Sequence, residues 1–155
     1  MALSTPKWTL LQVNGSERPI YGDKKAGTAT IKPGMICALA ANDVINPVSS
    51  ADAVLSGIVA VEAGWANNDP TKTVQEQPYA QGDTVNYVYT QPGDLVWLWL
   101  SASQTAVVGS LLAASGTAGE VSVEATNKDQ SVIYMAEEAV TTGAGEVKRI
   151  KARRL

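Results

Sequence analysis

The alternation of hydrophobic and polar positions is clearest between residues 82 and 100. Val85, Tyr87 and Tyr89 occupy every second position, which predicts a strand with one buried face. Residues 92–94, Pro-Gly-Asp, predict a turn, because proline fixes its own φ angle and glycine accepts a positive one. Residues 95–100 are apolar at every position, so both faces of this second strand must be covered.

One face of residues 95–100 is expected to pack in the protein's own core, and three alternatives remain for what buries the other face. They are a long loop, a second sheet and another molecule. We favour a central core strand over an interface strand, because soluble proteins rarely expose large apolar patches.

Short apolar segments of the strand type recur along the rest of the chain, separated by glycine, proline and asparagine. Convincing helical patterns are missing, and small and β-branched residues dominate the composition. The sequence therefore predicts an all-β fold, a small antiparallel β-barrel or β-sandwich with an extended N-terminal arm. Strands are expected within residues 8–13, 28–41 (two strands around Pro33-Gly34), 56–63, 120–125, 133–140 and 146–151, and short apolar pieces at 106–108 and 111–113 lie around Gly109.

The N-terminal residues 1–27 are predicted to form the arm, and residues 28–155 the β domain. After the strand-like residues 8–13 the arm is polar and contains several glycines and prolines. It either crosses the surface of its own domain or reaches a neighbour. Residues 64–81 form a long polar insertion, and loops of that length are more often functional than idle.

Residue types that support common catalytic and metal-binding chemistry are scarce. The chain has no histidine and one cysteine, which excludes Ser-His and Cys-His pairs, disulfide frameworks and thiolate zinc sites. Asp83 and Asp94 follow glycines in turns, where aspartate side chains bind the backbone. We therefore expect no enzyme activity, cofactor, metal or small-molecule substrate. The carboxylates considered as acid–base candidates are Glu62, Asp83, Asp94, Glu137 and Glu138.

Hydropathy and charge narrow the partners further. The chain has no 18-residue apolar span and no leader pattern, so we expect a soluble protein without membrane contact. Five of the 12 basic residues lie in the last eight positions, and the preceding residues carry 15 acids against 7 bases. Such a tail favours a charged final strand or an acidic partner over nucleic acid. Cys37, in an apolar run, is expected to be a small buried residue.

Short motifs, most of them turns, follow one another at residues 31–34, 57–60, 82–85, 92–94, 109–112, 116–121, 136–140 and 145–153. Their order resembles the head decoration, or capsid cement, proteins of tailed bacteriophages. The resemblance covers residues 28–155, and residues 64–81 depart from it. It implies a small β protein, often trimeric, that lies on the outer capsid surface of the virion after synthesis in the host cytoplasm. Its implied partners are the major capsid protein, whose neighbouring subunits it bridges, and further copies of itself.

Two rival functions remain open at this stage, a tail or baseplate β module of a phage and a carbohydrate-binding β-sandwich. Aromatic and arginine side chains are enriched at the centres of protein interfaces, so they mark the candidate contact residues. The candidate protein-interface residues are Trp8, Leu10, Trp65, Trp97, Trp99, Arg149, Lys151, Arg153 and Arg154.

Overall fold

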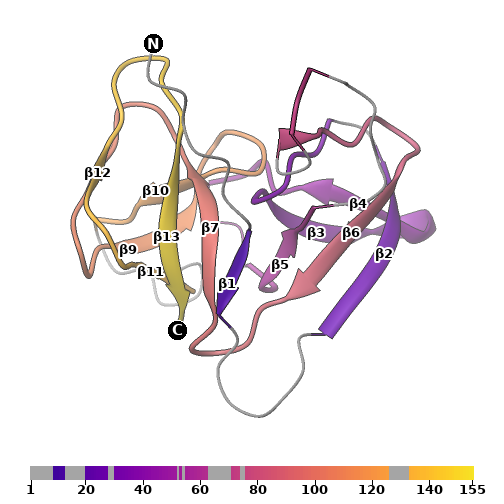
Figure 1. The fold of residues 1–155 in the computed structure, drawn as a ribbon, viewed down its shortest axis with the longest axis horizontal. Helices are drawn as coiled ribbons and strands as arrows, with labels where there is room; N and C mark the ends of the chain where they lie inside the picture. Colours follow the sequence, from indigo (N-terminus) through magenta and orange to yellow (C-terminus); the bar gives the residue numbers. More distant parts are fainter. Residues whose placement is uncertain are drawn as a thin grey trace.

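Two small closed β-barrels lie side by side in the computed structural model (Figure 1). The structure describes residues 9–12, 20–27, 30–51, 53, 55–62, 71–73, 76–125 and 133–155. Within these ranges it contains thirteen strands and one three-residue 3-10 helix, η1 (Ala41–Asp43). The predicted all-β fold is confirmed, and the barrel alternative is the one that the strand pairing supports.

The first barrel consists of five strands in the order β2-β4-β3-β5-β6. Its longest ladder is antiparallel and joins β2 to β6 from Ile20↔Tyr89 to Lys25↔Thr84. A parallel pairing between β2 and β4 completes the circle, so every strand has two neighbours and no open edge remains. The strands are β2 (Ile20–Ala26), β3 (Ile36–Ala40), β4 (Val44–Pro47), β5 (Ile58–Ala60) and β6 (Thr84–Tyr89).

Strand β2 lies within residues 1–27, the range predicted as an arm. Its sequence, IYGDKKA, shows no clear alternation of apolar and polar residues that would predict a strand. Only Ala26 of β2 is fully buried, so the other positions can be polar. Gly22 serves packing here, since a Cβ atom at this position would lie 2.4 Å from Cζ of Tyr87 on the neighbouring strand. The described part of the first barrel therefore begins at Ile20.

The second barrel is a sheet in the order β1-β7-β10-β9-β11-β13, closed by pairing between β7 and β13. The β7–β13 ladder is antiparallel and runs from Lys148↔Leu100 to Arg153↔Leu95. Strand β10 runs parallel to β7, and β8 and β12 form a separate two-stranded sheet. The strands are β1 (Leu10–Gln12), β7 (Leu95–Leu100), β8 (Thr105–Ala106), β9 (Leu111–Ala114), β10 (Val121–Val123), β11 (Tyr134–Ala136), β12 (Val140–Thr141) and β13 (Lys148–Arg154).

One continuous apolar cluster joins the two barrels. It contains the interior of the second barrel, where Leu98 and Leu100 of β7 are fully buried. It also includes Ile36, Val59 and Val88 from strands of the first barrel. Their neighbours Cys37, Ile58 and Tyr87 belong to a separate cluster in the first barrel. Alternate side chains of these strands thus belong to the two clusters, which is the period-2 geometry of a strand covered on both faces.

The C-terminal part of the 64–81 insertion packs on the first barrel. Tyr79 is fully buried, forms an antiparallel bridge with Ile31 and donates a hydrogen bond of 2.6 Å from its hydroxyl to the Val61 carbonyl. Residues 63–70, which include Trp65, and residues 74–75 lie outside the described residues.

Candidate interaction surfaces

The outward face of the paired strands β7 and β13 contacts the first barrel through Trp99 of β7 and Arg149 of β13. Trp99 donates a hydrogen bond of 2.8 Å from Nε1 to the carbonyl oxygen of Pro33, and Arg149 donates one of 2.8 Å from Nη1 to the same oxygen. The guanidinium carbon of Arg149 lies 5.0 Å from the centroid of the Trp99 ring, within the range of a cation–π contact. The turn before β3 therefore covers this part of the apolar strand.

Thr9 and Glu62 extend the same contact toward the N-terminal segment. Arg149 donates from Nη2 to Thr9 Oγ1 at 3.1 Å, and Thr9 donates from its hydroxyl and its backbone N to Glu62 Oε1 at 2.6 and 2.7 Å. Burial lowers the pKa of Arg149 to about 10, although the Glu62 carboxylate opposes the shift. Of the covers left open for β7, the structure thus uses segments of the same chain. We call Thr9, Pro33, Glu62, Trp99 and Arg149 the junction cluster.

A second polar contact between the barrels is centred on Tyr134. Thr90 donates from Oγ1 to the Gly57 carbonyl at 2.8 Å, so the Tyr134 hydroxyl, 2.8 Å from Oγ1, is the donor to Thr90. Burial raises the pKa of Tyr134 to about 12. The Arg154 guanidinium lies 5.9 Å from the Tyr134 ring centroid and donates from Nη1 to the Ile133 carbonyl at 3.2 Å.

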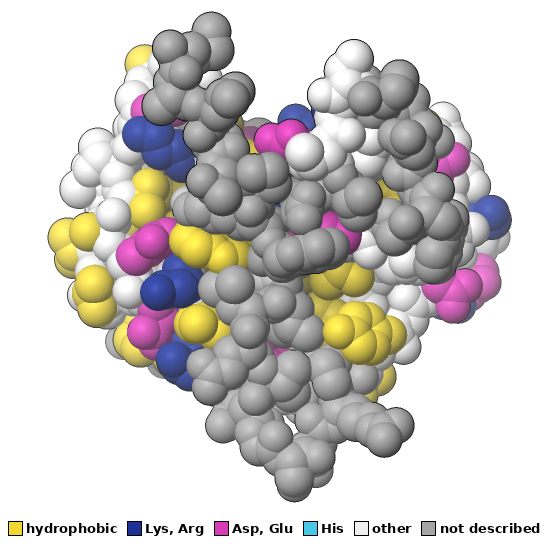
Figure 2. All heavy atoms as spheres, in the orientation of Figure 1, with side chains coloured by type: hydrophobic (Ala, Val, Ile, Leu, Met, Phe, Trp, Pro, Cys, Tyr) yellow, Lys and Arg dark blue, Asp and Glu magenta, His cyan; other side chains and the backbone are white. Residues whose placement is uncertain are grey.

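The basic C-terminal tail is a paired barrel strand, β13, and two of its basic side chains, Lys148 and Arg153, form ion pairs with glutamates of the same chain. Arg153 binds Glu137 through Nε and the Gly93 carbonyl through Nη1. The Lys148 ammonium lies 3.2 Å from Glu146 Oε2. Figure 2 shows Lys or Arg and Asp or Glu side chains alternating along the side of the second barrel where β13 runs. The backbone N of Lys151 donates to Glu138 Oε1 at 2.9 Å. The surface that contains the basic tail is therefore a strip of mixed charge, because glutamates of neighbouring segments lie beside it.

Of the remaining predicted contact residues, the structure describes Trp97 and the backbone of Leu10. Trp97 is half-buried on the outward face of β7, and its backbone N donates to the Thr9 carbonyl at 2.7 Å. The backbone of Leu10 pairs with Val96 in the β1–β7 ladder, whereas its side chain is not described. Trp8 and Trp65 lie outside the described residues.

The carboxylates considered for catalysis take part in structural hydrogen bonds. Asp83 Oδ2 accepts from the backbone N of Ala80, and Asp94 Oδ2 accepts from that of Gln91, each at 2.8 Å, which confirms their predicted turn role.

Cys37 is buried, as predicted, and burial raises the pKa of its thiol to about 12. Among the described residues, no three potential metal-binding side chains come together, and no helix is long and apolar enough to cross a membrane.

Sequence reasoning missed an exposed apolar turn on the second barrel. Val107 and Val108 follow β8 and are 58% and 68% exposed. The turn is held firmly, because the backbone N of Val107 donates to Ser110 Oγ and that of Gly109 donates to the Ala136 carbonyl. Hydrophobic side chains are visible at the outer edge of the second barrel in Figure 2. The glycine and serine after the valines were the signal for a turn instead of a strand.

Comparison with solved structures finds a similar fold in a bacteriophage protein. The crystal structure of the head fiber gp8.5 N base of bacteriophage phi29 superposes with a TM-score of 0.58 at 12% sequence identity. The match covers 89% of this chain and 95% of that chain, so it spans both barrels. No family model and no curated protein sequence matches. The likeness shows a shared fold.

Proposed function

We propose that this chain is a structural virion protein of a tailed bacteriophage that binds the outer capsid surface and bridges neighbouring major capsid subunits. The observation that carries the proposal is the shared fold with a phage head fiber base over nearly the full length of both chains. The decoration-protein motifs within residues 28–155 support the same assignment independently of the fold.

The chemistry of the described side chains supports a binding role over a catalytic one. Asp83 and Asp94 hold turns, Glu62 holds the junction cluster, and Glu137 pairs with Arg153. A capsid stabiliser needs a rigid body and contact surfaces instead of a reactive site. Closed barrels meet the first need, because each barrel strand is hydrogen-bonded to a neighbour on both sides.

We propose the Val107–Val108 turn as the principal capsid contact. Burying two exposed valines in a shell pocket releases water from apolar surface, which contributes roughly 1.5–3 kcal/mol for each fully buried side chain. The charged strip of β13 would add weak contacts that salt screens. Many copies on one lattice would raise the overall affinity through avidity.

We also propose that the protein acts as a homotrimer, the state that the decoration-protein resemblance implies. Light scattering of the purified protein measures this directly, because one chain has a mass of 16.2 kDa. A trimer in solution or on the capsid supports the proposal, whereas single, separated copies on the shell contradict it.

The decisive experiment adds purified protein to phage heads that lack it and images the particles by cryo-electron microscopy. We expect density on the outer shell at sites between capsid subunits, and higher resistance of decorated heads to heating. A double variant, Val107→Ser with Val108→Ser, should lose occupancy. The control Leu39→Ser removes another exposed aliphatic side chain, 45% exposed, from the first barrel and should bind normally.

Each outcome of this experiment separates the proposal from its rivals. Density on tails and none on heads would identify a tail or baseplate module and overturn the capsid assignment. Normal decoration by the double valine variant, with loss in the Leu39 control, would move the contact to the first barrel. Heads that bind no protein at any salt concentration would overturn capsid binding altogether.

A further inference from the structure

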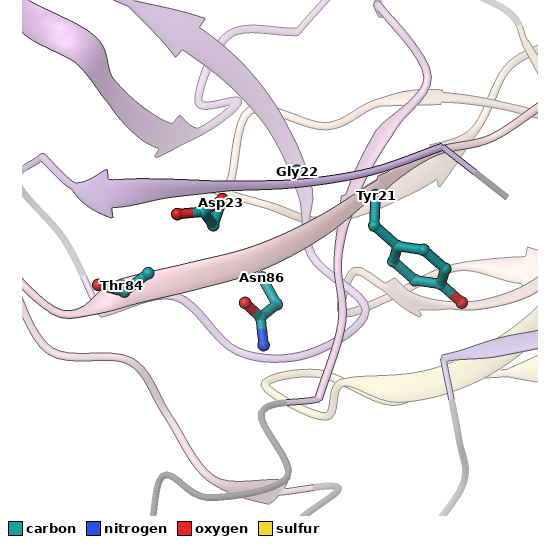
Figure 3. Close-up of a pocket in the computed structure, with 5 residues that line it drawn as sticks. All are labelled: Tyr21, Gly22, Asp23, Thr84 and Asn86. Carbon is teal, nitrogen blue, oxygen red and sulfur yellow. The ribbon is translucent and has the colours of Figure 1, made fainter.

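A hollow on the outer face of the first barrel is lined by two adjacent strands. Tyr21, Gly22 and Asp23 come from β2, and Thr84 and Asn86 from β6, around a volume of about 320 Å³ (Figure 3). In the antiparallel ladder Asp23 pairs with Asn86. Asp23 and Thr84 lie at one end of the hollow, Tyr21 at the other and Asn86 between them.

The polar groups of this hollow are available for a ligand. The Asp23 carboxylate and the Asn86 side-chain amide make no hydrogen bond to any of the described residues. Thr84 Oγ1 accepts a hydrogen bond of 2.9 Å from the Lys25 ammonium and keeps its own proton for donation. The set therefore offers a carboxylate acceptor, an amide that both donates and accepts, and a hydroxyl donor.

Tyr21 supplies the apolar part of the same surface. Its side chain is 60% exposed, although large aromatic side chains usually bury most of their area. Tyr21 lies opposite Val88 in the ladder, two residues from Asp23, so ring and carboxylate share one face of β2. An exposed ring beside unpaired polar groups is the combination that small-molecule sites use for contact and orientation.

We propose that this hollow is a saccharide-binding site. A sugar ring presents C–H groups on one face, which fit against the Tyr21 ring, and hydroxyls on its rim, which pair with Asp23, Asn86 and Thr84. The opposite charges of Asp23 and Lys25 leave the hollow without the excess of positive charge that binding of phosphate groups requires. The volume lies near the lower limit for ligand pockets, which suits one or two sugar rings.

This site goes beyond the proposed capsid binding and does not depend on it. The hollow lies on the first barrel, whereas Val107 and Val108 lie on the second, so each surface can be altered alone. A virion protein with both would hold the shell through one barrel and a glycan through the other.

The test uses a glycan array followed by titration calorimetry with maltotriose, the N-acetylglucosamine trimer and any array hit. Tyr21→Ala should weaken the binding found by about tenfold or more, because it removes the stacking surface. Tyr21→Phe keeps the ring and should bind like the parent, and Asp23→Asn should weaken binding without disturbing the fold. Glu146→Gln, an exposed carboxylate change on the second barrel, is the matched control and should have no effect.

Circular dichroism of each variant separates loss of binding from loss of fold, and Tyr21 is exposed enough for its replacement to be tolerated. Binding that falls in Tyr21→Ala and Asp23→Asn and persists in Tyr21→Phe supports the site. Absence of binding to every array glycan and to both trisaccharides at millimolar concentration overturns it. Binding that is equal in all four variants also overturns it, because the saccharide would then lie elsewhere.

Discussion

Replacing Gly34 by alanine tests how tightly the two barrels are joined. Gly34 has φ +89°, and a Cβ atom there would lie 2.8 Å from the carbonyl oxygen of Trp97 and 2.7 Å from Cζ of Arg149. The first of these neighbours is backbone within β7, which cannot shift without disturbing the β7–β13 ladder. The substitution therefore pushes the turn of the first barrel away from the second.

Two costs add up at Gly34. The left-handed conformation costs an L-residue roughly 1–2 kcal/mol. Forcing an extra carbon into a filled space costs typically about 1–3 kcal/mol more. The free energy of unfolding should therefore fall by roughly 2–5 kcal/mol, which corresponds to a Tm lower by about 4–20 °C for a chain of this size.

Gly109→Ala is the matched control, because it isolates the conformational cost. Gly109 has φ +90°, and a Cβ atom there would meet nothing within 4 Å. Urea unfolding, followed by tryptophan fluorescence and circular dichroism together, should show Gly34→Ala to be less stable than Gly109→Ala by about 1–3 kcal/mol. Both probes should report one transition, since the apolar cluster is continuous between the barrels.

Equal losses of stability in the two variants would refute the reasoning. That result would mean that the Pro33-Gly34 turn does not press against β7 in solution. Two separate unfolding transitions in the parent protein would contradict the shared core in the same way, because each barrel would then fold alone.

The remaining predictions concern buried hydroxyl and thiol groups. Tyr134→Phe should lower the free energy of unfolding by about 1 kcal/mol in urea, because it removes the buried hydrogen bond to Thr90; an unchanged value would show that this bond makes no net contribution. Burial raises the pKa of Cys37 from 9.0, and those of Tyr79 and Tyr134 from 10.0, to about 12. The folded state therefore holds these protons longer than the unfolded chain, so stability should be full below about pH 9 and decline as the pH approaches 12. The lowered pKa of Arg149 has the opposite effect on stability above about pH 10, because the folded state then releases this proton before the unfolded chain does. We expect the three groups with raised pKa values to outweigh it. Tm measured against pH checks this, and a Tm that stays flat or rises in that range would contradict the burial of these groups.

Local pattern was sufficient where apolar residues recur at every second position of a strand and where a turn has specific chemistry. The spacing of Val85, Tyr87 and Tyr89 predicts β6, and the Pro-Gly-Asp run predicts the turn before β7. Asp83 and Asp94 hold turns as expected, because the hydrogen bonds involved span only three residues. The all-β class and the burial of Cys37 follow from the same short-range information.

Only the tertiary structure decided which segments close the barrels and what covers β7. Strand β2 is polar and contains a glycine, so nothing local marks it as a strand. The ladder to β6, a strand far along the chain that pairs Ile20 with Tyr89 and Lys25 with Thr84, creates it. Trp99 and Arg149 contact Pro33 and Thr9 of the same chain, and these distant partners could not be read from the local pattern. A sequence pattern indicates that a strand face must be buried. Which segment buries it depends on contacts between residues far apart in the chain, and the local spacing of apolar residues carries no information about those contacts.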